Sequence, residues 1–156
     1  MTKYEELLDE VYQEGLYVIE RAGFNSHARG LINGDVIGLN KVIETDVKRR
    51  CILAEELGHY YTTSGNILDI SNVMNRKQEF RARVWGYQRI ITMDKLIAAY
   101  HKGCRNSYEI AEELEVTEDF FLEALQVFKQ KYYPYIQYKD YLIRFEPTLQ
   151  IYAFAV

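Results

Sequence analysis

Residues 53–61, LAEELGHYY, combine carboxylates and a histidine at the spacing of a metal-binding helix. Side chains four residues apart lie on one face of an α-helix, so Glu55 and His59 can contact the same ion. In the usual metallopeptidase pattern, H-E-x-x-H, two histidines bind zinc and the glutamate beside the first is the general base. Glu55 stands where the first histidine is expected. The segment indicates either a metal site with a carboxylate ligand or a helix without metal chemistry.

Glu56 is the candidate general base. The helical repeat turns its side chain about 100° away from Glu55, so it is poorly placed as a ligand but can reach a water molecule at the ion. A third ligand has to come from another segment, and in glutamate-type zincins it is a glutamate on the following helix. Glu79, 20 residues after His59, is the candidate. The alternative for Glu79 is an exposed carboxylate on a charged helix face.

A hairpin and a capped helix are expected to position the first ligands. Within residues 29–40, Asn33-Gly34 separates two apolar runs, which is a strong hairpin signal and predicts a small antiparallel sheet. The ligand helix is then expected to begin at Thr45 or Asp46, either of which can cap it. Residues at helical spacing should face the core: Val47, Cys51, Ala54, Gly58 and Tyr61.

A second helix is expected from about Asn75, with Gln78 as its capping-box partner. Its small residues Ala82 and Gly86 would let it approach the ligand helix closely. The other predicted elements are a helix over 3–13, a short strand over 16–19, a helix over 93–101 capped by Thr92, helices over 107–114 and 117–132 capped by Ser107 and Thr117, and a strand-rich tail over 135–156.

Composition restricts the classes of function. The 156-residue chain has 48% hydrophobic residues and a formal charge of −4, which suits one globular domain. The negative charge disfavours direct nucleic-acid binding, because phosphate contacts need a cationic face. We expect no membrane association, since no long apolar run or signal peptide is found. Cys51 and Cys104 have no metal or disulfide spacing, so a cytoplasmic location is expected.

Longer segments carry a resemblance to a known family. They are GLINGDVIGLN, KRRCILAEELGHYYTTSGNILD, NRKQEFRARVWGY and IAEELEVTEDFFLEAL. In these segments the chain resembles the ImmA/IrrE-type metallopeptidases of Gram-positive bacteria and their phages. The resemblance covers most of the chain and is least specific from Pro134 to Val156. It implies an α+β, zincin-like (minimal gluzincin) domain with a core over 1–92, a helical extension over 93–133 and a β-rich tail over 134–156.

The resemblance also implies roles for individual residues. His59 corresponds to the second zinc-binding histidine, Glu56 to the catalytic glutamate and Glu79 to the downstream glutamate ligand, whereas Glu55 replaces the first histidine. The implied activity is a metal-dependent endopeptidase that cleaves or inactivates a helix-turn-helix repressor of a phage or mobile element. In that activity Glu56 takes a proton from the metal-bound water and passes it to the leaving amine.

Glu55 changes the charge of the metal site. Two histidines and one glutamate leave a net charge of +1 around a divalent ion, whereas Glu55, His59 and Glu79 leave zero. The ion is then a weaker Lewis acid. Carboxylates also favour harder metals, so Mn²⁺ and Fe²⁺ join Zn²⁺ as expected cofactors.

Several alternatives stay open. His27 could supply the missing ligand, although a surface histidine is the commoner case. His27, Tyr60 and Tyr61 are also candidates for stabilising the oxyanion. A peptide substrate could lie extended along an edge strand of the hairpin sheet. The main rival function is a non-catalytic binding module that docks a repressor or another phage protein without cleaving it.

The helices over 107–132 mimic a helix-turn-helix, but acidic residues Glu118, Asp119 and Glu123 begin the second helix. Acidic groups oppose contact with phosphates and base edges at that position. We therefore expect this pair to be a packing or partner-docking element that does not bind DNA.

Overall fold

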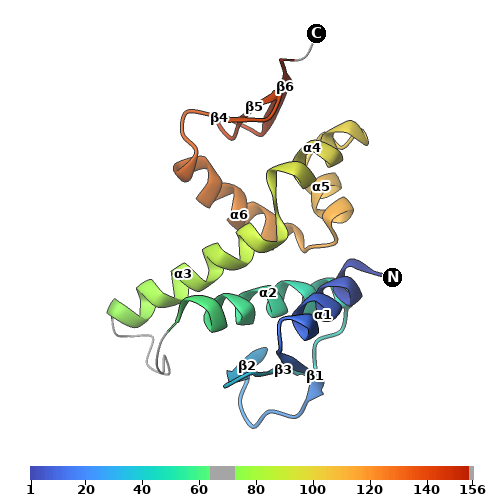
Figure 1. Ribbon diagram of the computed structural model, residues 1–156, viewed down its shortest axis with the longest axis vertical. Coiled ribbons are helices and arrows are strands. Elements are labelled where there is room, and N and C mark those ends of the chain that lie inside the picture. Colours follow the sequence, from blue (N-terminus) through green and yellow to red (C-terminus); the bar gives the residue numbers. More distant parts are fainter. Residues whose placement is uncertain (64–72, 155–156) are drawn as a thin grey trace.

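The computed structural model describes residues 1–63 and 73–154, with two small sheets at opposite ends of a helical body (Figure 1). The elements are α1 (Lys3–Gln13), β1 (Tyr17–Ala22), β2 (Gly30–Asn33), β3 (Val36–Asn40), α2 (Asp46–Thr62), α3 (Val73–Ile90), α4 (Met93–His101), α5 (Ser107–Leu114), α6 (Glu118–Lys131), β4 (Ile136–Tyr138), β5 (Tyr141–Arg144) and β6 (Gln150–Ala153). The predicted α+β class is confirmed. No helix in the described part of the chain is both long and apolar enough to cross a membrane.

The N-terminal sheet has the strand order β1-β3-β2 and is mixed. β2 and β3 form the predicted antiparallel hairpin, but β1 pairs in parallel with β3, so the expectation of a purely antiparallel sheet is wrong. The reason is that residues 23–29 carry the chain from β1 past the central position to the far edge of the sheet. β2 is consequently an edge strand.

The hairpin turn lies one residue later than predicted. Asn33 pairs with Val36, which leaves Gly34 and Asp35 as the two turn residues. Gly34 has a φ of +61°, which glycine adopts without strain and which two-residue hairpin turns require. The Asn33-Gly34 signal therefore identified the hairpin correctly, but it misplaced the centre of the turn.

Helices α2 and α3 pack directly against each other through small residues. A Cβ atom added to Gly58 would lie 2.0 Å from the carbonyl oxygen of Ala82, and one added to Gly86 would lie 2.9 Å from that of Ala54. The helices therefore touch backbone to backbone at two places. The close approach predicted from Ala82 and Gly86 is confirmed.

The buried face of α2 is mostly as predicted. Cys51, Ala54 and Gly58 are buried and Val47 is half-buried, but Tyr61 is 43% exposed and does not belong to the core. Tyr61 instead stacks on Trp85 of α3, with ring centroids 4.9 Å apart. Trp85 therefore gives this large ring a packing partner at the protein surface.

Helix starts follow local capping chemistry. Thr45, Thr92 and Thr117 cap α2, α4 and α6 as predicted. The cap of α5 is Asn106 instead of Ser107, because the Asn106 side chain accepts a 2.8 Å hydrogen bond from the N–H of Glu109. α3 begins at Val73, two residues ahead of the predicted Asn75, and the predicted capping box with Gln78 involves a side chain outside the described part of the chain.

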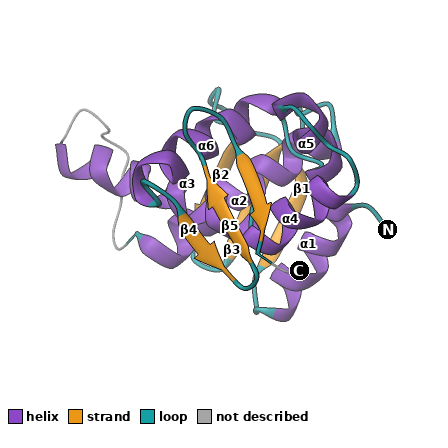
Figure 2. Ribbon diagram, turned by 90° about the horizontal axis from the view of Figure 1, so that it is seen from above, coloured by secondary structure: helices purple, strands orange, loops and turns teal. Residues whose placement is uncertain are grey.

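The C-terminal half contains α4, α5 and α6 and an antiparallel sheet of order β4-β5-β6. Seen from above, this sheet lies in front of the helices, with the N-terminal sheet behind them (Figure 2). Phe121, Phe128 and Ile143 are fully buried, and Phe145 packs on Phe128. The strand-rich tail is confirmed for residues 135–154; residues 155–156 lie outside the described chain.

Candidate metal centre

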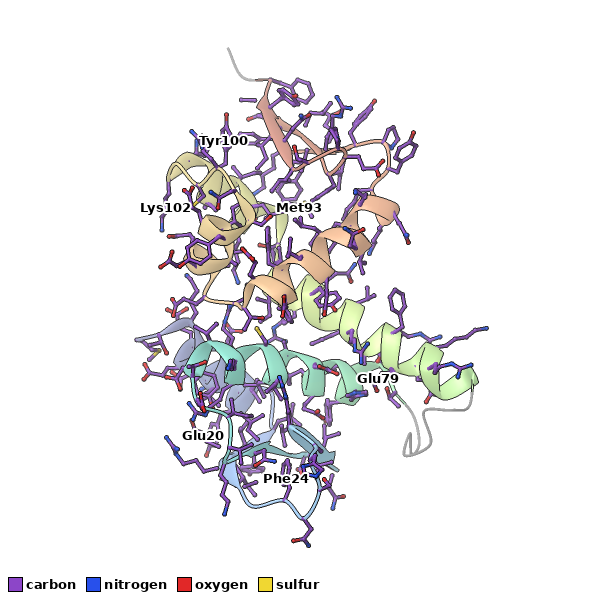
Figure 3. The ribbon with its side chains drawn as sticks, turned by 180° about the vertical axis from the view of Figure 1, so that it is seen from behind. Glu20, Phe24, Glu79, Met93, Tyr100 and Lys102 are labelled. Atoms are coloured by element: carbon purple, nitrogen blue, oxygen red, sulfur yellow. The ribbon has the colours of Figure 1, made fainter. Side chains whose placement is uncertain are left out.

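Three side chains from two helices meet in one place. Glu55 and His59 lie on α2 and Glu79 on α3, and one ligand atom from each lies within 4.8 Å of the others. Nε2 of His59 is 3.2 Å from Oε2 of Glu79. Figure 3 shows Glu79 on α3 where that helix runs beside α2. The structure therefore brings together all three predicted ligands.

The donor set fits a divalent cation. Nitrogen and carboxylate oxygen ligands bind Zn²⁺ at about 2.0–2.2 Å, so ligand atoms around one ion lie within a few ångströms of each other, as they do here. Nε2 of His59 faces a carboxylate instead of a backbone carbonyl. Two carboxylates that meet one imidazole need a proton or a cation between them. We therefore regard Glu55, His59 and Glu79 as able to hold a metal.

The close approach of Glu55, His59 and Glu79 shifts the pKa values of all three groups. Burial raises the pKa of Glu55, and its hydrogen bond with Glu79 raises it further. The contact with His59 lowers the pKa of Glu79. Burial opposes protonation of His59, but the bond to Glu79 and the nearby carboxylates outweigh it and raise the His59 pKa. Metal binding at this site would displace protons.

Glu56 lies beside the edge strand β2. Its residue is only 8% exposed, and a Cβ added to Gly30 of β2 would lie 2.9 Å from both Cγ and Oε1 of Glu56. Burial raises the pKa of Glu56 to about 7, with Glu55 and Glu79 adding to the rise and His59 opposing it. A carboxyl group with a pKa near neutrality can both accept and return a proton at physiological pH.

The centre opens into a groove of about 980 Å³. One wall is β2 with its turn, the floor is α2, and the start of α6 forms the opposite side. Thr117, Phe120 and the acidic Asp119 and Glu123 of the α6 region line it. Sequence reasoning missed this wall, because its distance along the chain from α2 gave no local signal.

Arg83 is a second residue that sequence reasoning missed as part of the site. Its Nε lies 3.6 Å from Oε1 of Glu55, and its Nη2 lies 3.7 Å from Oε1 of Glu79. The guanidinium therefore faces both carboxylate ligands. The available signal was its position four residues after Glu79, which places both side chains on one face of α3.

The remaining predicted candidates separate into two groups. Tyr60 lines the groove and is 40% exposed. Tyr61 does not line it, and its hydroxyl donates a 3.0 Å hydrogen bond to Glu14. His27 is exposed in the loop before β2 and lies outside both the groove and the ligand cluster, so it does not replace the missing histidine.

A family model described as "IrrE N-terminal-like domain" (Peptidase_M78) matches residues 13–126, which include every residue of the centre and its groove. No curated protein matches the chain, and no solved structure matches it.

Proposed function

Since the chain belongs to the IrrE N-terminal-like domain (Peptidase_M78) family, we propose that it is a metal-dependent endopeptidase whose metal is held by Glu55, His59 and Glu79. The observation that carries this proposal is the convergence of these three side chains, from two helices, beside the buried Glu56. A structural role alone gives no reason to gather three carboxylates around one histidine.

Zn²⁺, Mn²⁺ and Fe²⁺ are the cations that this donor set suits. Histidine with carboxylates is compatible with zinc, and the second carboxylate moves the preference towards harder ions. When bound, such an ion supplies Lewis-acid chemistry to a water molecule and to the peptide carbonyl.

Glu56 is the proton carrier in the proposed reaction. Its carboxylate lies between the ligand helix and β2, where an attacking water and a peptide on the strand edge would meet. A pKa of about 7 lets Glu56 take the proton of the attacking water and return it to the leaving amine. Tyr60 is the candidate that lines the groove for stabilising the oxyanion.

A peptide substrate would lie extended along β2. This strand is at the sheet edge, so its outer backbone N–H and C=O groups can pair with one more strand. Leu31 and Ile32 of β2 line the same groove as the metal ligands. The pairing would place a backbone carbonyl of the substrate over the centre while the groove accepts its side chains.

The substrate that we propose is a helix-turn-helix repressor of a phage or mobile element, cleaved or inactivated in the cytoplasm. The family supports the protein-substrate class, and the two free cysteines suit a reducing compartment. We propose no direct contact with nucleic acid, because Asp119 and Glu123 of the α5–α6 pair face the groove.

The test measures metal content and cleavage with the purified protein, and the metal-free form of the same protein is the control. Wild-type protein should bind one ion per chain, and Glu79→Ala or His59→Ala should remove it. Glu56→Gln should keep the ion but lose cleavage of a helix-turn-helix repressor offered as substrate, because only the proton carrier is removed. Cleavage by Glu56→Gln at the wild-type rate would refute the mechanism.

One observation favours a second candidate, a peptidase-fold module that binds a repressor or another phage protein without cleaving it. Glu55 cancels the remaining positive charge of the centre and weakens the ion as a Lewis acid. This candidate predicts that wild-type protein and Glu56→Gln bind the repressor equally, and that the repressor stays intact with Zn²⁺, Mn²⁺ or Fe²⁺.

A further inference from the structure

Arg83 is the only cationic side chain with an ion pair to both carboxylate ligands among the described residues. Building on the proposed metal centre, we propose that Arg83 is the counter-charge to Glu55: its guanidinium returns to the centre the positive charge that a glutamate at this position removes. Arg83 is thus a positioning residue that tunes the centre without touching the ion.

The contacts divide the oxygens of Glu79 between two partners. Oε2 faces Nε2 of His59 at 3.2 Å, whereas Oε1 faces Nη2 of Arg83 at 3.7 Å. One oxygen is thus directed to the ligand cluster and the other to the guanidinium. Arg83 also reaches Oε1 of Glu55 at 3.6 Å, so it spans the carboxylates of both helices.

The distances from Arg83 to the two carboxylates are longer than those of a good hydrogen bond, so the interaction is mainly electrostatic. The two carboxylates, one imidazole and a divalent ion sum to zero, and the guanidinium brings the sum to +1. A set of two histidines and one glutamate has that charge by itself. Arg83 is 50% exposed in its side chain, so solvent screens the effect without abolishing it.

The proposal predicts the direction in which metal affinity changes when the charge of Arg83 is removed. A fixed positive charge beside a cation site repels the cation, so removal of the charge should tighten metal binding. With water-like screening at the separation that shared carboxylates impose, the change is on the order of tenfold. A residue that merely held the ligands in place would act in the opposite direction, since loss of such support weakens metal binding about 10–100-fold.

The experiment compares Arg83→Gln with two matched variants. Arg83→Lys keeps the charge. Arg81→Gln removes the same charge from the same helix, but in the described chain Arg81, unlike Arg83, has no ion pair with Glu55 or Glu79. The dissociation constants for Zn²⁺ and Mn²⁺ are measured at pH 8 by competition with a chromogenic chelator, and thermal unfolding is followed with and without Zn²⁺.

We expect Arg83→Gln to bind both ions about tenfold more tightly, with Arg83→Lys and Arg81→Gln close to wild type. The melting temperature of metal-free Arg83→Gln should be slightly lower than that of the wild type, because Glu55 and Glu79 lose an ion-pair partner. Added Zn²⁺ should raise the melting temperature of Arg83→Gln more than that of the wild type. Unchanged or weaker binding by Arg83→Gln would overturn this inference while leaving the metal centre intact. Failure of the wild type to bind any ion would instead overturn the proposed function, and this inference with it.

Discussion

The two ends of the helical body have interiors of different kinds. The buried polar and charged residues of the described chain all fall between positions 40 and 56: Asn40, Arg49, Arg50 and Glu56. Around α6 and the C-terminal sheet the interior is aromatic and aliphatic. Of these residues only Glu56 belongs to the candidate metal centre, and burial of its ionisable group is unfavourable for stability. The apolar interior between α6 and the C-terminal sheet contains no buried charged residue in the described chain, so we expect it to supply the stability.

The largest expected effect tests the α6 region. Phe121→Ala removes a fully buried ring from α6 and should lower the free energy of unfolding by about 3–5 kcal/mol. Denaturant unfolding measures this loss. The folded fraction should keep its metal affinity within about threefold, because Phe121 lies outside the ligand cluster. A parallel collapse of metal affinity would contradict the division into two regions.

The next effect tests the contact between the ligand helices. Gly58→Ala would place Cβ against the carbonyl oxygen of Ala82, 2.0 Å away, and should destabilise the fold by about 3 kcal/mol. Metal affinity should fall too, because α2 and α3 must separate. Gly23→Ala is the control, since nothing lies within 4 Å of its added Cβ. Equal stability of both variants in denaturant unfolding would argue against the close packing.

Glu56→Gln should stabilise the metal-free protein, and only at higher pH. The pKa of Glu56 rises from 4.5 to about 7 on folding, so the carboxyl group is protonated in both states below pH 4.5, and its cost to the folded state grows from pH 4.5 and levels off above pH 7. The gain should be about 3 kcal/mol at pH 8 and less than about 1 kcal/mol at pH 5.

Chelator-treated protein unfolded by urea at both pH values checks the Glu56 effect. Glu112→Gln provides an exposed control with the same chemical change. A gain at pH 5 equal to that at pH 8 would show that the stabilisation has a cause other than the buried charge.

The smallest expected effect is the loss of a helix cap, and it should be equal for α2 in the N-terminal half and for α4 in the C-terminal half. Thr45 caps α2 and Thr92 caps α4, each accepting a 3.2 Å hydrogen bond from a backbone N–H. Thr45→Ala and Thr92→Ala should each reduce stability by about 1 kcal/mol. Thermal unfolding of the two variants under metal-free conditions makes the comparison. A much larger loss of stability for Thr45→Ala than for Thr92→Ala would show that the two regions also differ in how strongly their helix caps stabilise the fold.

Local patterns accounted for the parts of the site that a single helix determines. The four-residue spacing of Glu55 and His59, and the caps Thr45 and Thr117, depend only on neighbours in the chain. Glu79 was accessible because the family pattern places a ligand on the following helix. For these residues, sequence and structure agree.

The parts that sequence reasoning missed depend on distant segments. The parallel pairing of β1 with β3 depends on the path of residues 23–29, and Asp119 reaches the groove only through the packing of α6. Tyr61 satisfied the helical period but found a surface partner in Trp85. Arg83 had the right spacing, yet its second partner, Glu55, belongs to another helix. Periodicity does not reveal contacts of this kind.

The glycine contact between α2 and α3 has a consequence for how such a centre can change over time. Backbone contact at Gly58 and Gly86 sets the spacing of the two helices. A ligand can then be exchanged at position 55 without rebuilding the scaffold, provided that a neighbour such as Arg83 adjusts the charge. In the proposed metal centre, the helix pair would therefore be a fixed scaffold on which metal preference can evolve by changes of single side chains.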